Sequence, residues 1–143
     1  MQSKDVIRSA MGFSDQVFST YLSDMSDQDL LTRPGDGCNH VAWQIGHLIS
    51  SEVMLLEMIC QGEGITLPDG FAETHSKENC DCDDGSNFHT LQQYQELYEK
   101  ARKASRAALD SMPEERLDEE SPEQMRSFCP TLTDMWVLIA THP

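Results

Sequence analysis

Two histidines of this 143-residue chain lie on the apolar faces of predicted helices, where their chemistry suits a metal site. His47 lies inside the long apolar stretch from residue 39 to residue 60. His142 projects within about 80° of the apolar residues of the last helical segment, Leu132, Met135, Leu138 and Ile139. Neutral imidazoles on facing helices bind zinc, nickel, iron or copper. The pair predicts a metal site inside a helical bundle; the alternative is two hydrogen-bonded core histidines.

Two further polar residues of this stretch need an explanation. Glu52 lies on its apolar face, about 140° around the helix from His47, so both side chains reach one metal ion only with strain. We favour a buried carboxylate paired to Arg, Tyr or backbone over one that supports a metal ligand or transfers a proton. His40, two turns before His47, is expected at the helix entrance rather than at the metal.

Four segments carry the periodic apolar residues of amphipathic helices. The second, third and fourth have the predicted N-caps Asn39, Thr90 and Thr131. The joins are short except for an irregular connection from residue 62 to residue 89. This pattern predicts one all-α domain, residues 1–143, folded as a four-helix bundle with a long crossover between the second and third helices and a short fourth helix.

The chain is strongly acidic, with 10 basic and 25 acidic side chains and a net charge of −15. Such a surface repels phosphate backbones and anionic lipids, which argues against nucleic-acid or membrane partners. The first residues predict no signal peptide, and the five cysteines predict no disulfide framework, so we expect a cytoplasmic protein. Cys80 and Cys82 either hold a soft metal or, as we favour, are two loop thiols.

Three stretches resemble the DinB-like family of DNA-damage-inducible, YfiT-like four-helix proteins. Asn39–Leu48, which contains Gly-His-Leu around His47, is similar to the family's second helix, whose histidine is the first of three metal ligands. Leu67–Asn79 is similar to the loop after that helix, and Leu138–His142 to the start of the last ligand-bearing helix. The resemblance implies an up-up-down-down bundle, a divalent metal such as zinc or nickel, and a homodimer.

The resemblance also implies two activities, each found in different members of the family. A metal-bound water is a nucleophile for hydrolysis, and an open metal also lowers the pKa of a bound thiol for S-transfer. We therefore expect a metal-dependent enzyme that acts on a small-molecule substrate, such as a low-molecular-weight thiol. The alternative is a metal-free bundle that binds a small molecule or serves as a dimerisation module.

The last helix departs from the family pattern, which has His-x-x-x-His where this chain ends one residue after His142. The third ligand is therefore missing. His75, in the loop that resembles the family, is the candidate substitute; the alternative is a loop histidine that binds no metal. No glycine cap stops the helix, so its last four carbonyls are expected to lack partners. We expect a fragment of a longer protein, with a ligand about four residues beyond His142. Incomplete cover of the first two helices is a further reason to expect a dimer.

Overall fold

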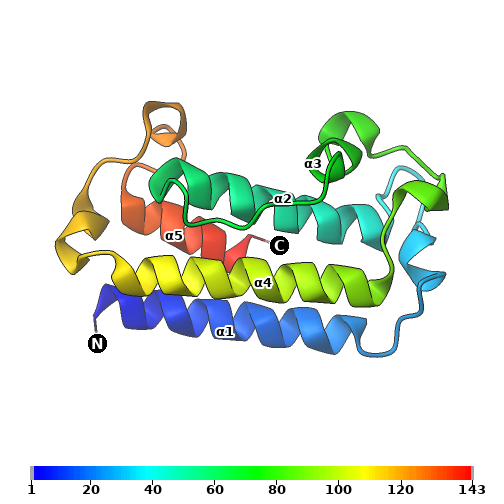
Figure 1. The fold of residues 1–143 in the computed structure, drawn as a ribbon, viewed down its shortest axis with the longest axis horizontal. Helices are drawn as coiled ribbons and strands as arrows, with labels where there is room; N and C mark the ends of the chain where they lie inside the picture. The colour runs from blue at the N-terminus through cyan, green and yellow to red at the C-terminus, as the bar shows by residue number, and fades with distance from the viewer. Residues whose placement is uncertain (1, 143) are drawn as a thin grey trace.

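The computed structural model describes residues 2–142, and its regular elements are helices (Figure 1). Four long helices form the bundle: α1 (Ser3–Leu22), α2 (Val41–Ile59), α4 (Leu91–Ser111) and α5 (Leu132–Thr141). The connections contain the one-turn α3 (Phe71–Thr74) and the 3-10 turns Asp29–Leu31, Lys77–Asn79, Gly85–Asn87, Glu114–Asp118 and Glu123–Met125. The predicted all-α bundle is confirmed.

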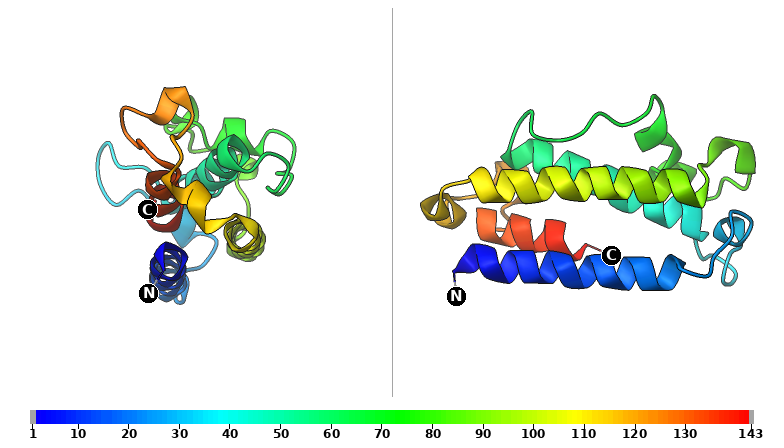
Figure 2. Two further views of the ribbon diagram at one scale, coloured as in Figure 1. Left: turned by 90° about the vertical axis from the view of Figure 1, so that its left-hand side faces the viewer. Right: turned by 60° about the horizontal axis from the view of Figure 1, so that its bottom comes forward.

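The directions of the helices differ from the expected up-up-down-down course. α1 and α2 run in opposite directions, α2 and α4 run parallel, and α5 runs beside α1 in the same direction (Figure 1, Figure 2). Arg8 near the start of α1 bonds to Asp110 near the end of α4, and Glu52 of α2 bonds to Ser105 of α4. The course is therefore up-down-down-up. The predicted crossover returns the chain along the bundle between the parallel α2 and α4.

The core consists of two apolar clusters toward opposite ends of the bundle. One joins α1, α2, α4 and α5 around the fully buried Met135 and Trp136. The other joins α1, α2, α3 and α4 around Phe71 and Tyr94. Because α5 has only 10 residues, it covers the first cluster and ends partway along α1 (Figure 2).

The helix starts follow the predicted caps with one correction. Capping boxes open α4 and α5 where the sequence predicted them. However, α2 is capped by His40 instead of Asn39. The Nδ1 atom of His40 accepts from the Trp43 N–H at 3.0 Å, and its Nε2–H donates to the Cys82 carbonyl at 3.0 Å. The imidazole both caps the helix and ties it to the crossover, so His40 does lie at the helix entrance.

The end of α5 is capped by a side chain from α4, so the expectation that its carbonyls lack partners is wrong. The Arg102 guanidinium donates to the carbonyls of Ile139, at 2.8 Å, and Ala140, at 3.2 Å. The His142 N–H donates to the Leu138 carbonyl at 2.8 Å. Pro143 lies outside the described residues, and continuation of the natural chain beyond it stays a prediction.

α1 exposes the large apolar side chains Val6, Phe13, Val17 and Tyr21, and the last three line a pocket between α1 and α2. Exposed apolar residues of this size suit an interface, but the homodimer stays a prediction. Among the described residues, no helix combines the length and the hydropathy needed to cross a membrane.

Candidate metal centre

The rings of His47 and His142 converge between α2 and the end of α5, as the sequence predicted. Their centroids are 6.0 Å apart, and the ring planes are tilted by 49°. His47 lies in the second turn of α2, and His142 is the C-cap of α5. The two helices run in opposite directions, which brings the early part of one beside the late part of the other. Their role as metal ligands stays a prediction.

The orientation of His47 is set by the loop that follows α2. Its Nδ1–H donates to the backbone carbonyl of His75, with the two atoms 3.2 Å apart. Its ring stacks on Trp43 with centroids 4.7 Å apart, and the Trp43 Nε1–H donates to the carbonyl of Ser76 at 2.9 Å. A proton on Nδ1 leaves the lone pair of Nε2 available, which is how metal-binding histidines are commonly oriented.

His142 carries a buried nitrogen without a bond. Its Nδ1 atom has no hydrogen-bond partner among residues 2–142. An unpaired buried polar atom costs about 1–3 kcal/mol. Burial, together with the neighbouring His47, lowers the pKa of His142, so the ring favours the neutral form that binds metals. A metal ion on this imidazole nitrogen would offset the cost.

The spacing of the rings fits a shared metal ion after a small adjustment. With metal–nitrogen bonds of about 2.0 Å, two imidazoles on a tetrahedral ion have centroids roughly 5 Å apart. The observed separation is 6.0 Å. Among the described residues, no group of three or more His, Cys, Asp or Glu side chains is arranged to hold a metal ion. The described chain therefore offers two nitrogen donors, and other molecules would complete the coordination.

The His75 ring is committed to other partners. It is buried, its Nδ1–H donates to the Phe71 carbonyl at 2.7 Å, and its Nε2 accepts from the Tyr94 hydroxyl at 2.7 Å. Burial raises the pKa of Tyr94 to about 12, so this hydroxyl keeps its proton. Burial also lowers the pKa of His75 to about 4. To act as a third ligand, the ring would have to give up one of these bonds; here His75 supports His47 through its carbonyl.

Gly46 makes room for this loop against α2. A Cβ atom at this position would lie 2.0 Å from Cδ2 of the His75 ring. The ring can pack on the helix backbone only because Gly46 has no side chain. The sequence analysis did not anticipate this contact. The available signal was a glycine in the interior of an apolar helix, directly before a candidate ligand.

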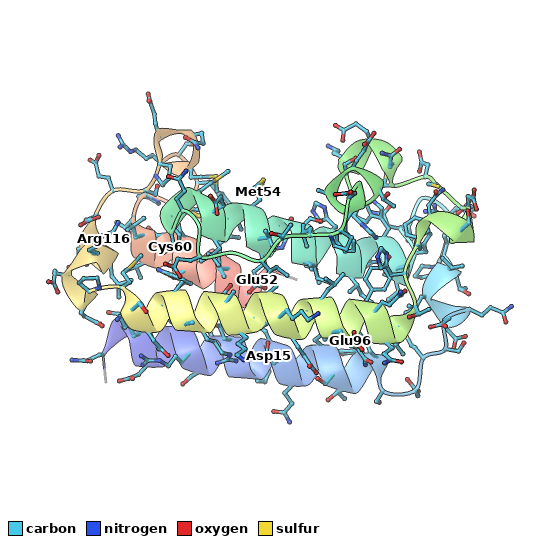
Figure 3. All side chains as sticks on the ribbon, in the orientation of Figure 1. Asp15, Glu52, Met54, Cys60, Glu96 and Arg116 are labelled. Atoms are coloured by element: carbon cyan, nitrogen blue, oxygen red, sulfur yellow. The ribbon has the colours of Figure 1, made fainter. Side chains whose placement is uncertain are left out.

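Glu52 is paired to α4, the interpretation that the sequence favoured. Its Oε1 accepts from the Ser105 hydroxyl at 2.7 Å, and its Oε2 lies 3.4 Å from Nη1 of Arg102. Figure 3 shows Glu52 on the side of α2 that faces α4. Burial raises the pKa of Glu52, and Arg102 and Ser105 oppose that rise. The carboxylate therefore acts on Arg102 rather than on the histidine rings.

A pocket of about 470 Å³ opens beside His142. It lies between α1 and α2, with α4 contributing side chains at one side. Its lining is mostly apolar and includes Phe13, Val17, Tyr21, Val41, Ile45 and Leu48. A concave apolar surface with a few polar groups is typical of small-molecule sites.

The fold and the site define a helical bundle with paired imidazoles in its interior. The family model of the DinB superfamily matches residues 13–143, which is most of the chain. The chain belongs to the DinB superfamily, as the motif around His47 indicated. Comparison with curated proteins and with solved structures gave no match in either case.

The contact at Gly46 predicts a destabilising Gly46→Ala substitution. The new methyl group meets a ring held at both nitrogens, so we expect a loss of about 2 kcal/mol in the free energy of unfolding. Gly12→Ala in α1 is the matched control, because nothing lies within 4 Å of a Cβ there. It should stabilise the protein by about 1 kcal/mol. Urea unfolding measures both; equal effects of the two alanines would contradict the contact.

The depressed pKa of His75 predicts a loss of stability toward low pH. An unfolded histidine takes up a proton near pH 6.5, whereas the folded ring resists protonation until about pH 4. Stability is therefore full above pH 6.5 and falls as the pH drops toward 4, with a slope of about 1.4 kcal/mol per pH unit from this residue. His75→Gln should remove that slope in urea unfolding between pH 6 and pH 4.5. Burial also lowers the pKa of the partly exposed His89, so His89→Gln should reduce the slope, but by less than His75→Gln. An unchanged slope in His75→Gln would show that the ring is not responsible.

Proposed function

We propose that this protein is a cytoplasmic DinB-type metalloenzyme in which His47 and His142 bind a divalent transition metal, zinc or nickel. Its proposed reaction is thiol S-transfer or metal-assisted hydrolysis of a small-molecule substrate. The observation that carries the proposal is the unpaired Nδ1 of His142 beside a His47 ring whose Nε2 is left available. Membership of the DinB superfamily supports it.

The chain's own residues would prepare the site for this chemistry. When bound, the metal would supply Lewis acidity that lowers the pKa of a coordinated water or thiol. The His75 carbonyl holds the Nδ1 proton of His47 in place, and Trp43 covers one face of its ring. The pocket beside His142 offers an apolar surface for the substrate. Two protein ligands leave positions open for both a nucleophile and a substrate.

A second candidate is a metal-free module that binds a small molecule, and the same apolar pocket favours it. The two candidates differ in what the imidazole pair must do. Metal binding requires both rings, whereas a purely apolar ligand in the pocket requires neither Nε2 of His47 nor Nδ1 of His142.

We expect the metal-free protein to bind one Zn²⁺ or Ni²⁺ per chain, with Trp43 as the reporter. Its indole stacks on His47, so a metal on that ring should change its fluorescence. His47→Ala and His142→Ala should each weaken binding by at least about 100-fold, because loss of a direct ligand exceeds the usual effect of losing a supporting residue.

His89→Gln is the control for this titration and should bind as the unchanged protein does. Trp43→Phe identifies the reporter, because the chain has only one other tryptophan, the buried Trp136. Metal analysis that finds the same stoichiometric metal in His47→Ala would sink the ligand assignment and favour the metal-free module.

Loading with Co²⁺ separates the two reactions. Thiolate is a soft ligand, so addition of a low-molecular-weight thiol should produce an intense near-ultraviolet sulfur-to-cobalt absorption band if the site activates thiols. The band should be absent in His47→Ala. A Co²⁺-loaded protein without such a band at millimolar thiol would leave hydrolysis as the proposed reaction.

A further inference from the structure

Arg102 is a buried guanidinium that meets all four long helices near the middle of the bundle. It belongs to α4, it is 5% exposed, and its Nε lies 2.9 Å from Oδ1 of Asp15 in α1. Its Nη1 lies 3.4 Å from Glu52 of α2. Its two terminal nitrogens donate to the carbonyls of Ile139 and Ala140 in the last turn of α5.

These last two hydrogen bonds supply donors to carbonyl oxygens in the last turn of α5, where a helix runs out of backbone N–H donors. In a helix, the carbonyl of Ile139 would accept from the N–H of residue 143, but proline has no N–H. Nη1 of Arg102 takes that place at 2.8 Å. A cation at this position also complements the partial negative charge at a helix C-terminus.

Asp15 and Glu52 hold the Arg102 guanidinium where it can cap the end of α5. Glu52 is itself fixed by Ser105, and Asp15 also pairs with Arg106. Burial lowers the pKa of Arg102, but Glu52, Tyr98 and Asp15 outweigh this effect and raise it, so the charge is permanent. The planar fork of an arginine can donate to two successive carbonyls while it stays within ion-pair distance of two carboxylates, which an ammonium group cannot do with the same geometry.

We propose that Arg102 is a positioning residue for His142. By capping Ile139 and Ala140, it fixes the last turn of α5 and thereby places the His142 ring 6.0 Å from that of His47. The inference rests on the proposed function only in treating His142 as a ligand. The anchoring of α5 itself can be measured without metal.

The test compares Arg102→Met with the double variant Glu52→Gln/Arg102→Met. The single variant leaves a buried carboxylate unpaired and can fail to fold, whereas the double variant removes that charge and keeps an acceptor for Ser105. Arg106→Met is the matched control: it lies one turn further along α4 and pairs with Asp15, and its guanidinium makes no hydrogen bond to α5 among the described residues. Leu117→Ala, in the cluster that contains neither Phe71 nor Tyr94, supplies a destabilised protein in which the residues around His47 keep their contacts.

In the metal-free protein, hydrogen exchange of the His142 amide should become at least tenfold faster in the double variant, relative to amides in the middle of α2. Arg106→Met should leave it unchanged. In the metal titration, the double variant should bind Zn²⁺ about 10- to 100-fold more weakly, while Leu117→Ala binds normally despite its lower stability.

A folded double variant with unchanged exchange at His142 would overturn the proposal, and so would unchanged Zn²⁺ affinity alongside faster exchange. If the unchanged protein binds no metal, the proposed function fails. Faster exchange at His142 in the double variant would then still establish that Arg102 anchors α5, and unchanged exchange would reject both ideas.

Discussion

The buried cluster around Arg102 is the interaction on which the arrangement of the four helices depends. Asp15, Glu52 and Arg102 come from α1, α2 and α4, and the guanidinium reaches the backbone of α5. Loss of one partner from a buried ion pair usually costs about 3–5 kcal/mol, because the remaining charge stays desolvated. The cluster lies between two apolar cores, whose stabilisation by the hydrophobic effect is not directional. Directional bonds at the centre therefore fix the axial position of each helix, and with it which residues face one another.

A second, local constraint acts on α2. The loop that contains α3 lies on this helix where Gly46 leaves the backbone bare, and two successive carbonyls, those of His75 and Ser76, accept from His47 and Trp43. Gly46 and His47 therefore act together: Gly46 leaves space for the loop to pack on α2, and the loop's His75 carbonyl orients the His47 ring. Tyr94 of α4 completes the contact by donating to the His75 ring. The position of His47 is consequently a property of α2, the loop and α4 together.

Local patterns predicted the helices and the convergence of His47 with His142, because apolar periodicity determines which side of a helix faces the core. Local patterns failed to predict the cap at the start of α2 and the cap at the end of α5, because each of these caps depends on a residue distant in the chain. Asn39 has the better cap chemistry, but the Cys82 carbonyl holds the His40 ring at the helix start. The end of α5 looked uncapped because its cap comes from Arg102, 37 residues away. Helix direction was taken from the family resemblance and was wrong, since periodicity carries no information about which end of a helix points up.

The parallel course of α2 and α4 has a consequence for folding kinetics. Each helix is rich in local contacts and can form early, but the histidine pair joins residues 95 positions apart, and His75 meets Tyr94 only after the crossover has returned along the bundle. Contacts of such sequence separation carry a large loop-closure entropy and tend to form late. The helices are therefore expected to assemble around their apolar clusters before the imidazoles meet, so that a collapsed bundle precedes the finished site. A metal ion present during folding would then bind at the last step, when the two rings meet, and would not initiate the collapse of the bundle.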